Sequence, residues 1–223
     1  MDEAKTAHQI RKEFARFISS CRPGDIVYLP FSCHGQPVED LNGDEEDGWD
    51  EAIIPVDAQK VYQKDKYTGD NHIKDDELNE YLCSIRNKVG NKGFVYVVID
   101  ACHAGSSYRG GEEDDSIIVR GTNHVFSPSG KRFAPRIDKR RKIRVEKSVS
   151  MANICILEAC RSDQVNSEIL EDGVYYGSLS FYVNKVLKST PLSSDVSWIE
   201  KVRRLMDLDT RILIQHMVIE TSL

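Results

Sequence analysis

A histidine and a cysteine each follow an apolar run of the sequence. His34 comes just past the run IVYLPFSC, and Cys102 comes just past FVYVVIDA. A thiolate is the nucleophile in cysteine-based covalent catalysis, and a nearby imidazole can supply or remove the protons. If the two runs are neighbouring strands of a parallel sheet, both side chains share the crevice beyond the carboxyl ends of those strands. The spacing therefore predicts a Cys/His site.

Glycines beside these two residues would let a substrate backbone approach closely, because Gly35 and Gly105 carry no side chain. We expect the backbone N–H groups of Gly35 and Cys102 to hold a developing oxyanion, because the strand ladder ends at both points. The structural alternative is that most of the six cysteines are buried core residues and that His34 is a structural histidine. Both residues follow a predicted strand in the same way, so from chemistry alone we weigh the catalytic and the structural interpretation equally.

The elements that must position these residues alternate between helix and strand. Apolar spacing predicts helices over residues 4–20, 75–89, 179–187 and 198–215. Short apolar runs rich in β-branched residues predict strands over residues 25–31, 52–56, 93–100 and 154–159, with a last short strand within 216–223. The run at 93–100 is apolar throughout, as in a parallel sheet that is covered on both faces. This order predicts an α/β sandwich.

Length and composition fit a soluble domain of 223 residues, 40% hydrophobic and 30% charged. A chain of this size buries about 70% of its unfolded surface, so it needs neither disulfide nor metal to fold. The longest apolar run, residues 94–99, is far shorter than the ~20 residues of a membrane span. A net charge of −6 argues against general attraction to nucleic acid or an anionic membrane. Without an export signal, we expect a cytoplasmic protein with free thiols.

The order of the motifs along the chain resembles that of metacaspases and related caspase-like cysteine peptidases. The matching motifs are FSCHGQ, DLNGDEEDGWDEAIIPVDA, IKDDEL, VVIDACHAG, ILEACRSDQVNSE and YYGSLSFYVNKVL. The resemblance covers nearly the whole chain. It implies a single caspase-like peptidase domain over residues 1–223, a three-layer sandwich with a mostly parallel central sheet. It also implies a cysteine endopeptidase that hydrolyses peptide bonds with a His34–Cys102 dyad.

Asp100 is the residue through which the resemblance implies a substrate preference. It precedes Cys102 by two positions, and the matching Asp of metacaspase-like enzymes lies in the primary specificity pocket. A buried carboxylate there would pair with Arg or Lys, so we expect protein or peptide substrates cleaved after a basic residue. The alternative is that Asp100 merely caps the turn after its strand.

Residues 39–51 hold eight acids in thirteen positions and are predicted to form a loop. The spacing matches an EF-hand in part, but its sixth position lacks the glycine that the sharp turn requires, so we exclude a true EF-hand. Many metacaspases bind calcium, and the resemblance implies Asp50, Asp75 and Asp76 as candidate ligands. Arg109 stands where relatives carry a further acid. We expect no required cofactor, favour a solvated acidic loop, and keep calcium as an alternative.

A long connection, residues 106–150, contains a basic segment over residues 131–144, in which eight of fourteen residues are Lys or Arg. As a nucleic-acid patch it lacks interleaved aromatic residues beyond Phe133, so we expect no nucleic-acid partner. Two alternatives stay open, a solvated loop and a self-cleavage linker, because exposed loops are where proteases cut. If the enzyme cuts after basic residues, the candidate self-cleavage sites are Arg132, Arg136, Arg141 and Arg144.

The chain departs from the family at its beginning. Cys33 stands directly before His34, where relatives usually carry Gly. Relatives also have a further strand upstream, which lies inside the sheet and contributes a second acid to the specificity pocket, and this chain lacks it. Three explanations of the missing strand stay open. The sequence is a fragment, or a partner chain fills the edge that the strand leaves, or the protein is a catalytically inactive caspase-like interaction module. A cysteine-based phosphatase is excluded, since Tyr108 stands where the phosphate loop needs its arginine.

Overall fold

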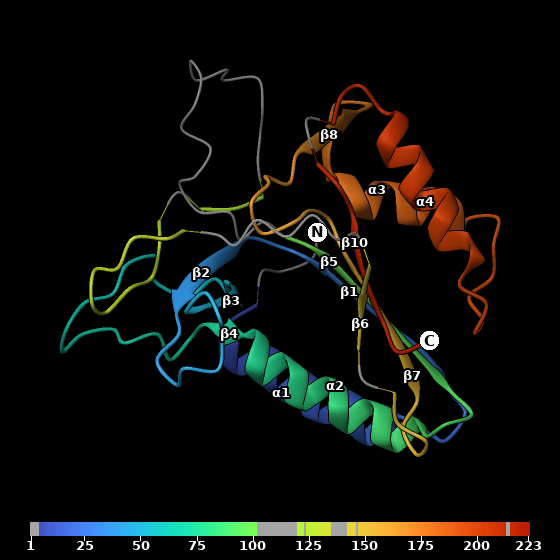
Figure 1. The fold of residues 1–223 in the computed structure, drawn as a ribbon, viewed down its shortest axis with the longest axis horizontal. Coiled ribbons are helices and arrows are strands. Elements are labelled where there is room, and N and C mark those ends of the chain that lie inside the picture. The colour runs from blue at the N-terminus through green and yellow to red at the C-terminus, as the bar shows by residue number, and fades with distance from the viewer. Residues whose placement is uncertain (1–4, 102–119, 123, 135–141, 146, 213–214) are drawn as a thin grey trace.

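The computed structural model describes the chain except for residues 1–4, 102–119, 123, 135–141, 146 and 213–214 (Figure 1). Its helices are α1 (Ala7–Ser20), α2 (Asp75–Val89), α3 (Ser178–Leu187) and α4 (Ser197–Leu208). The central sheet consists of β1 (Ile26–Ser32), β5 (Phe94–Asp100), β7 (Asn153–Glu158), β10 (Val218–Thr221) and β6 (Lys142–Arg144), in that spatial order. Two smaller sheets contain β2 (Gly35–Glu39), β3 (Trp49–Ile53) and β4 (Ile73–Lys74), and β8 (Glu168–Glu171) with β9 (Val174–Gly177).

The central sheet is mostly parallel. Strands β1, β5 and β7 run parallel to one another, β10 is antiparallel to β7, and β6 is parallel to β10. Helices α1 and α2 lie on one face and α3 and α4 on the other, which makes three layers (Figure 1). The α/β sandwich expected from the sequence is therefore confirmed.

Side chains of β5 alternate between two apolar cores, as the two-residue period of a strand requires. Phe94, Tyr96 and Val98 pack with α3 and α4. Val95 and Val97 pack with α1 and α2. All five are at most 1% exposed, and burying a large apolar side chain stabilises a fold by about 1.5–3 kcal/mol. This strand therefore anchors Asp100, at its carboxyl end, to both layers.

Helix boundaries follow local chemistry. The α1 helix begins at a capping box in which Thr6 and Gln9 satisfy each other's backbone N–H groups. The α2 helix has the predicted bounds, with three acids in its first turn and two basic residues in its last, as the helix dipole favours. The predicted extent of the last helix, to residue 215, is wrong. It ends at Leu208, because Asp209 is extended and its carboxylate accepts hydrogen bonds from Tyr182 and Arg211.

The acidic segment is only partly a loop, contrary to its composition. Its first residue, Glu39, closes β2, and Trp49 opens β3, so the loop spans residues 40–48. The backbone pairing of β3 with β2 and β4 overrides the low strand propensity of Asp50 and Glu51. The predicted strand at residues 52–56 is thus found earlier in the sequence, as β3.

Strands β1 and β5 pair directly with each other, without a gap. The register runs from Ile26 opposite Phe94 to Ser32 opposite Asp100. We expected an open edge where relatives insert a further strand, and the structure closes that position by direct pairing. Strand β1 instead lies at the end of the sheet. Among the described helices, none has the length and apolar character needed to cross a membrane.

Candidate active site

The register of β1 with β5 brings the two chemistry-bearing strand ends to one edge of the sheet. Ser32 lies opposite Asp100, and the backbone N–H of Cys33 donates to the Asp100 carbonyl at 3.3 Å. His34 follows Ser32 by two residues, and its side chain is exposed. Cys102 follows Asp100 by two residues in the sequence but lies outside the described residues. The His34–Cys102 dyad and the oxyanion role of the Cys102 N–H therefore stay predictions.

Gly35 differs from expectation in one respect. We expected backbone pairing to have ended there, but Gly35 opens β2 and pairs with Ile53. It also forms a parallel bridge with Gly121. The chain therefore passes from the central sheet directly into the smaller β2–β3–β4 sheet, and this turn sets the position of His34.

Asp100 is fully buried at the carboxyl end of β5. Its carboxylate accepts hydrogen bonds from the Asn166 side chain and from the Ser180 backbone N–H, both at 2.7 Å. Ser180 lies in the first turn of α3, whose N-cap residue, Gly177, has no side chain to do the capping. Asp100 thus caps a helix distant in sequence. The alternative that Asp100 caps the turn after its own strand stays a prediction, because the residues from Cys102 onward lie outside the described part of the chain.

A second charged side chain, Arg120, shares the space beside Asp100. A side chain added at Gly177 would collide with both Asp100 Oδ2 and Arg120 Nε. Arg120 Nη1 donates to Ser32 Oγ at 2.7 Å, and Arg120 Nε lies 3.1 Å from Glu168 Oε1. Neither Arg120 nor Glu168 was singled out from the sequence: Arg120 belongs to none of the quoted motifs, and Glu168 ends the motif ILEACRSDQVNSE without a chemical role assigned to it. Only the fold brings the two together.

Cys33, the extra thiol beside His34, is electrostatically inert. Burial, reinforced by the charge of Asp100 and partly opposed by Arg120, raises the pKa of Cys33 to about 12. A thiol with this pKa stays protonated at neutral pH, so it is a poor nucleophile. Its presence near the strand end therefore does not duplicate the predicted role of Cys102.

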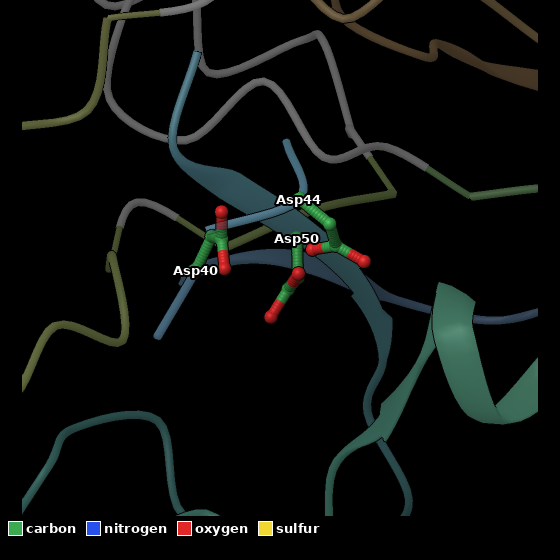
Figure 2. A group of neighbouring side chains, drawn as sticks. All are labelled: Asp40, Asp44 and Asp50. Atoms are coloured by element: carbon green, nitrogen blue, oxygen red, sulfur yellow. The ribbon is translucent and has the colours of Figure 1, made fainter. Parts of the chain in front are cut away.

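Of the three predicted calcium ligands, Asp50 lies in a group of carboxylates. One oxygen from each of Asp40, Asp44 and Asp50 lies within 4.8 Å of the other two (Figure 2). Asp50 Oδ2 accepts from Lys74 Nζ at 2.5 Å. Its Oδ1 is buried and has no hydrogen-bond partner within the described part of the chain. Burial raises the pKa of Asp50, and the Lys74 ammonium opposes that shift.

The other two predicted ligands are placed differently. Asp76 Oδ2 accepts from the Asn42 side chain at 3.2 Å. Burial, followed by the charges of Glu51 and Asp50, raises the pKa of Asp75 to about 7. Asp75 and Asp76 line a cavity of about 460 Å³. Within the described residues, the structure groups Asp50 with Asp40 and Asp44 rather than with Asp75 and Asp76.

That cavity, bordered by α2 and β7, is strongly acidic. Its lining includes Glu51, Asp75, Glu158 and Glu220, with Arg161 as a basic member. Burial raises the pKa values of all four carboxyl groups, that of Glu51 to about 7, and the charge of Glu51 adds to the shifts of the other three. These acids therefore tend to hold protons near neutral pH.

The predicted self-cleavage segment is described only in part. Arg132 is exposed. Its neighbours fasten the start of the segment to the acidic loop: the Phe133 ring packs edge-on against Trp49, and Lys131 Nζ donates to the Gly48 carbonyl at 3.1 Å. Arg144 belongs to β6 and pairs with Thr221. Arg136 and Arg141 lie outside the described residues.

Known proteins similar to this chain agree with the fold and the motifs. A family model described as the metacaspase, peptidase C14 domain matches residues 1–109. The Metacaspase-1B of Aspergillus fumigatus is 26% identical, covering 91% of this chain and 53% of the relative. The Metacaspase-1 of Saccharomyces cerevisiae is 23% identical, covering 84% of this chain and 47% of the relative. The chain thus spans about half the length of these relatives.

A solved structure of a protein from Geobacter sulfurreducens matches with a TM-score of 0.58 at 19% identity. The match covers 98% of this chain and 74% of that one, and it supports the fold. The family model over residues 1–109 and the curated relatives agree that this chain is similar to metacaspases.

Proposed function

We propose that the chain is a cysteine endopeptidase that cleaves protein or peptide substrates after Arg or Lys. The supporting observation is the β1–β5 register, which puts Ser32 opposite Asp100. The residues two positions further along each strand are His34 and Cys102. Equivalent positions past the ends of paired parallel strands are where a nucleophile and its proton carrier would meet.

In this mechanism His34 takes the proton of the Cys102 thiol, and the thiolate attacks the carbonyl carbon of the substrate. The N–H group of Cys102 stabilises the tetrahedral oxyanion. His34 then protonates the leaving amine as the C–N bond breaks, which leaves a thioester. Water, deprotonated by His34, hydrolyses the thioester and restores the thiol. A reactive thiolate favours a reducing compartment such as the cytoplasm.

The proposed preference for basic residues rests on the surroundings of Asp100. This buried carboxylate faces the space that contains the guanidinium of Arg120. A negative charge held by Asn166 and by the N-terminus of α3 needs no reorganisation when a cation arrives. A substrate Arg or Lys would thus meet a pre-arranged acid.

We also propose that calcium binds without being required. The carboxylates of Asp40, Asp44 and Asp50 fit a hard cation, which prefers oxygen ligands, and the unpartnered Asp50 Oδ1 offers a free lone pair. A bound ion would supply positive charge that holds residues 40–48 against β3. Self-cleavage within residues 131–144 is part of the proposal, and the exposure of Arg132 supports it.

The test compares matched fluorogenic peptides that end in Arg, Lys or Asp, with calcium and with a chelator. Wild type, Cys102→Ala and His34→Ala are assayed side by side. We expect cleavage of the Arg and Lys peptides by wild type alone. Equal signals for wild type and Cys102→Ala would instead favour the inactive interaction module, and preference for the Asp peptide would remove the role of Asp100. Intact-mass analysis of the same samples reveals cuts after Arg132, Arg136, Arg141 or Arg144.

A further inference from the structure

Arg120 is an unusually enclosed arginine. Its side chain is 14% exposed, as is that of Glu168 beside it. Arginine side chains are almost never buried unless their charge is paired, so this position needs a specific set of partners. The structure provides a hydroxyl and a carboxylate, through the contacts with Ser32 Oγ and Glu168 Oε1.

The backbone around Arg120 is held by two contacts with distant segments. The Arg120 N–H donates to the Asn166 carbonyl at 3.0 Å. The next residue, Gly121, forms a parallel bridge with Gly35, directly after His34. The Arg120–Gly121 segment is thus fixed next to the residue that follows His34.

Four elements distant in sequence form the pocket around this guanidinium. Ser32 ends β1, Asp100 ends β5, Glu168 begins β8, and Gly177 precedes α3. The absence of a side chain at Gly177 is what leaves room, since a Cβ there would collide with Asp100 and Arg120. The pocket is therefore built for a flat, donor-rich cation next to two acids, the chemistry of a guanidinium.

Glu168 is the second acid of this pocket. A guanidinium has five N–H donors in a fixed fork, more than Asp100 can satisfy while it also caps α3. Glu168 belongs to the β8–β9 hairpin, and its Oε1 forms an ion pair with Arg120 Nε at 3.1 Å, without hydrogen-bond geometry at that N–H. A lysine side chain has no nitrogen that corresponds to Nε of the guanidinium. A pocket with Glu168 would therefore favour Arg over Lys.

We propose that Arg120 is an intramolecular ligand of the basic-residue pocket and that Glu168 selects arginine there. A substrate arginine must then displace Arg120 before it binds. That consequence rests on the proposed function, because only a peptidase would use this pocket for a substrate. The pocket itself can be tested without any cleavage.

The binding test uses the Cys102→Ala chain, which removes turnover, with N-acetyl-arginine amide as the probe and N-acetyl-norleucine amide as the uncharged control. Arg120→Ala should bind the arginine probe at least about ten-fold more tightly than its parent, and neither should bind the control. Arg16→Ala, which removes an exposed arginine of α1, should bind like the parent. Equal affinity of Arg120→Ala and parent would overturn the role of Arg120.

Two further variants in the Arg120→Ala background test the pocket residues. Glu168→Gln should weaken arginine binding about ten-fold and reduce the preference over N-acetyl-lysine amide. Gly177→Ala should abolish binding, because its Cβ fills the space. If Arg120→Ala has a lower melting temperature than its parent, the arginine probe should raise it again. This measurement tests binding to the pocket even when the substitution destabilises the fold. Unchanged affinity and selectivity in Glu168→Gln would overturn its assignment.

Kinetics then separate this inference from the proposed function. With Cys102 intact, Arg120→Ala should lower KM for the Arg-ending peptide at unchanged kcat. Absent cleavage in every variant, together with the predicted binding changes, would overturn the peptidase proposal and support the pocket. Cleavage after Arg with the same KM in wild type and Arg120→Ala would support the peptidase and overturn Arg120 as a ligand.

Discussion

Two acidic regions lie near the same end of the central sheet and differ in how the negative charge of their carboxyl groups is balanced. Around Asp100, the carboxylate accepts two hydrogen bonds, and the Arg120 guanidinium shares its space. In the cavity beside α2, burial raises the pKa values of Glu51, Asp75 and Glu158, and the charge of Glu51 adds to the shifts of the other two. The first region compensates its charge with donors, and the second lowers its charge by holding protons.

The difference follows from electrostatics in a partly dry environment. Desolvation penalises an ionised carboxyl group, and a donor or a cation offsets that penalty. Asp100 has these partners already in place, so it can serve as a fixed charge for a substrate. The cavity acids repel one another, so their charge depends on pH. Changes that remove or add partners in each region test this contrast.

The largest expected effect is in the compensated region. Asp100→Ala removes both hydrogen bonds and uncaps α3, so we expect a loss of about 3 kcal/mol in the free energy of unfolding, measured by urea denaturation. Asp195 offers a matched control, since its exposed carboxylate accepts from Ser197 at the start of α4. Asp195→Ala should cost clearly less than Asp100→Ala, because its carboxylate is exposed. Equal losses in the two variants would contradict a special role for the buried acid.

Adding a cation to the acidic loop is expected to have the next largest effect. Calcium at about one hundred times its Kd should stabilise wild type by about 2.7 kcal/mol, seen as a higher melting temperature. Asp50→Asn should weaken this response, because it removes the negative charge of the buried carboxylate of the group. Asp195→Asn should keep it. Equal calcium responses in Asp50→Asn and wild type would argue against this site.

Removing charge from the cavity should change the pH dependence of stability. The raised pKa values of Glu51 and Asp75, about 7 each, mean that the folded chain keeps protons that the unfolded chain loses above about pH 4. Their stabilisation is complete below about pH 4 and decreases as pH rises to about 7.

Glu51→Gln and Asp75→Asn should therefore each gain about 1–2 kcal/mol relative to wild type between pH 4 and 7, measured by denaturation in chelator. Glu39 gives a control of opposite sign, since hydrogen bonds from Ser127 and Ser129 lower its pKa. Glu39→Gln should lose stability relative to wild type as pH rises to about 4.5, and the loss should stay constant above that pH. A gain in that variant would contradict the assigned charge states.

The smallest expected effect concerns Cys33. With a pKa near 12, its thiol should react slowly with iodoacetamide at pH 8. Cys33→Ser should therefore change cleavage of the Arg-ending peptide less than two-fold. Mass spectrometry of the alkylated chain measures the labelling. Labelling of Cys33 as fast as that of a free thiol would show that the site is more open than the structure indicates.

The sequence predicts the central elements well because their signals are local. The α2 helix has acids at its start and Gly90 after its end, and β5 is apolar throughout. The β8–β9 hairpin was missed although Asp172-Gly173 is a two-residue turn signal, and both residues have positive φ. The pocket partners of Asp100 could not be predicted, because Arg120 and Glu168 meet only through the fold.

The most direct test of the central claim is kcat/KM for an Arg-ending peptide, compared between wild type and Cys102→Ala. We expect the substitution to reduce kcat/KM at least about 10³-fold, because it removes the nucleophile. The Asp-ending peptide should stay uncleaved by both. Equal kcat/KM values for the two chains would contradict the assignment of this protein as a cysteine endopeptidase.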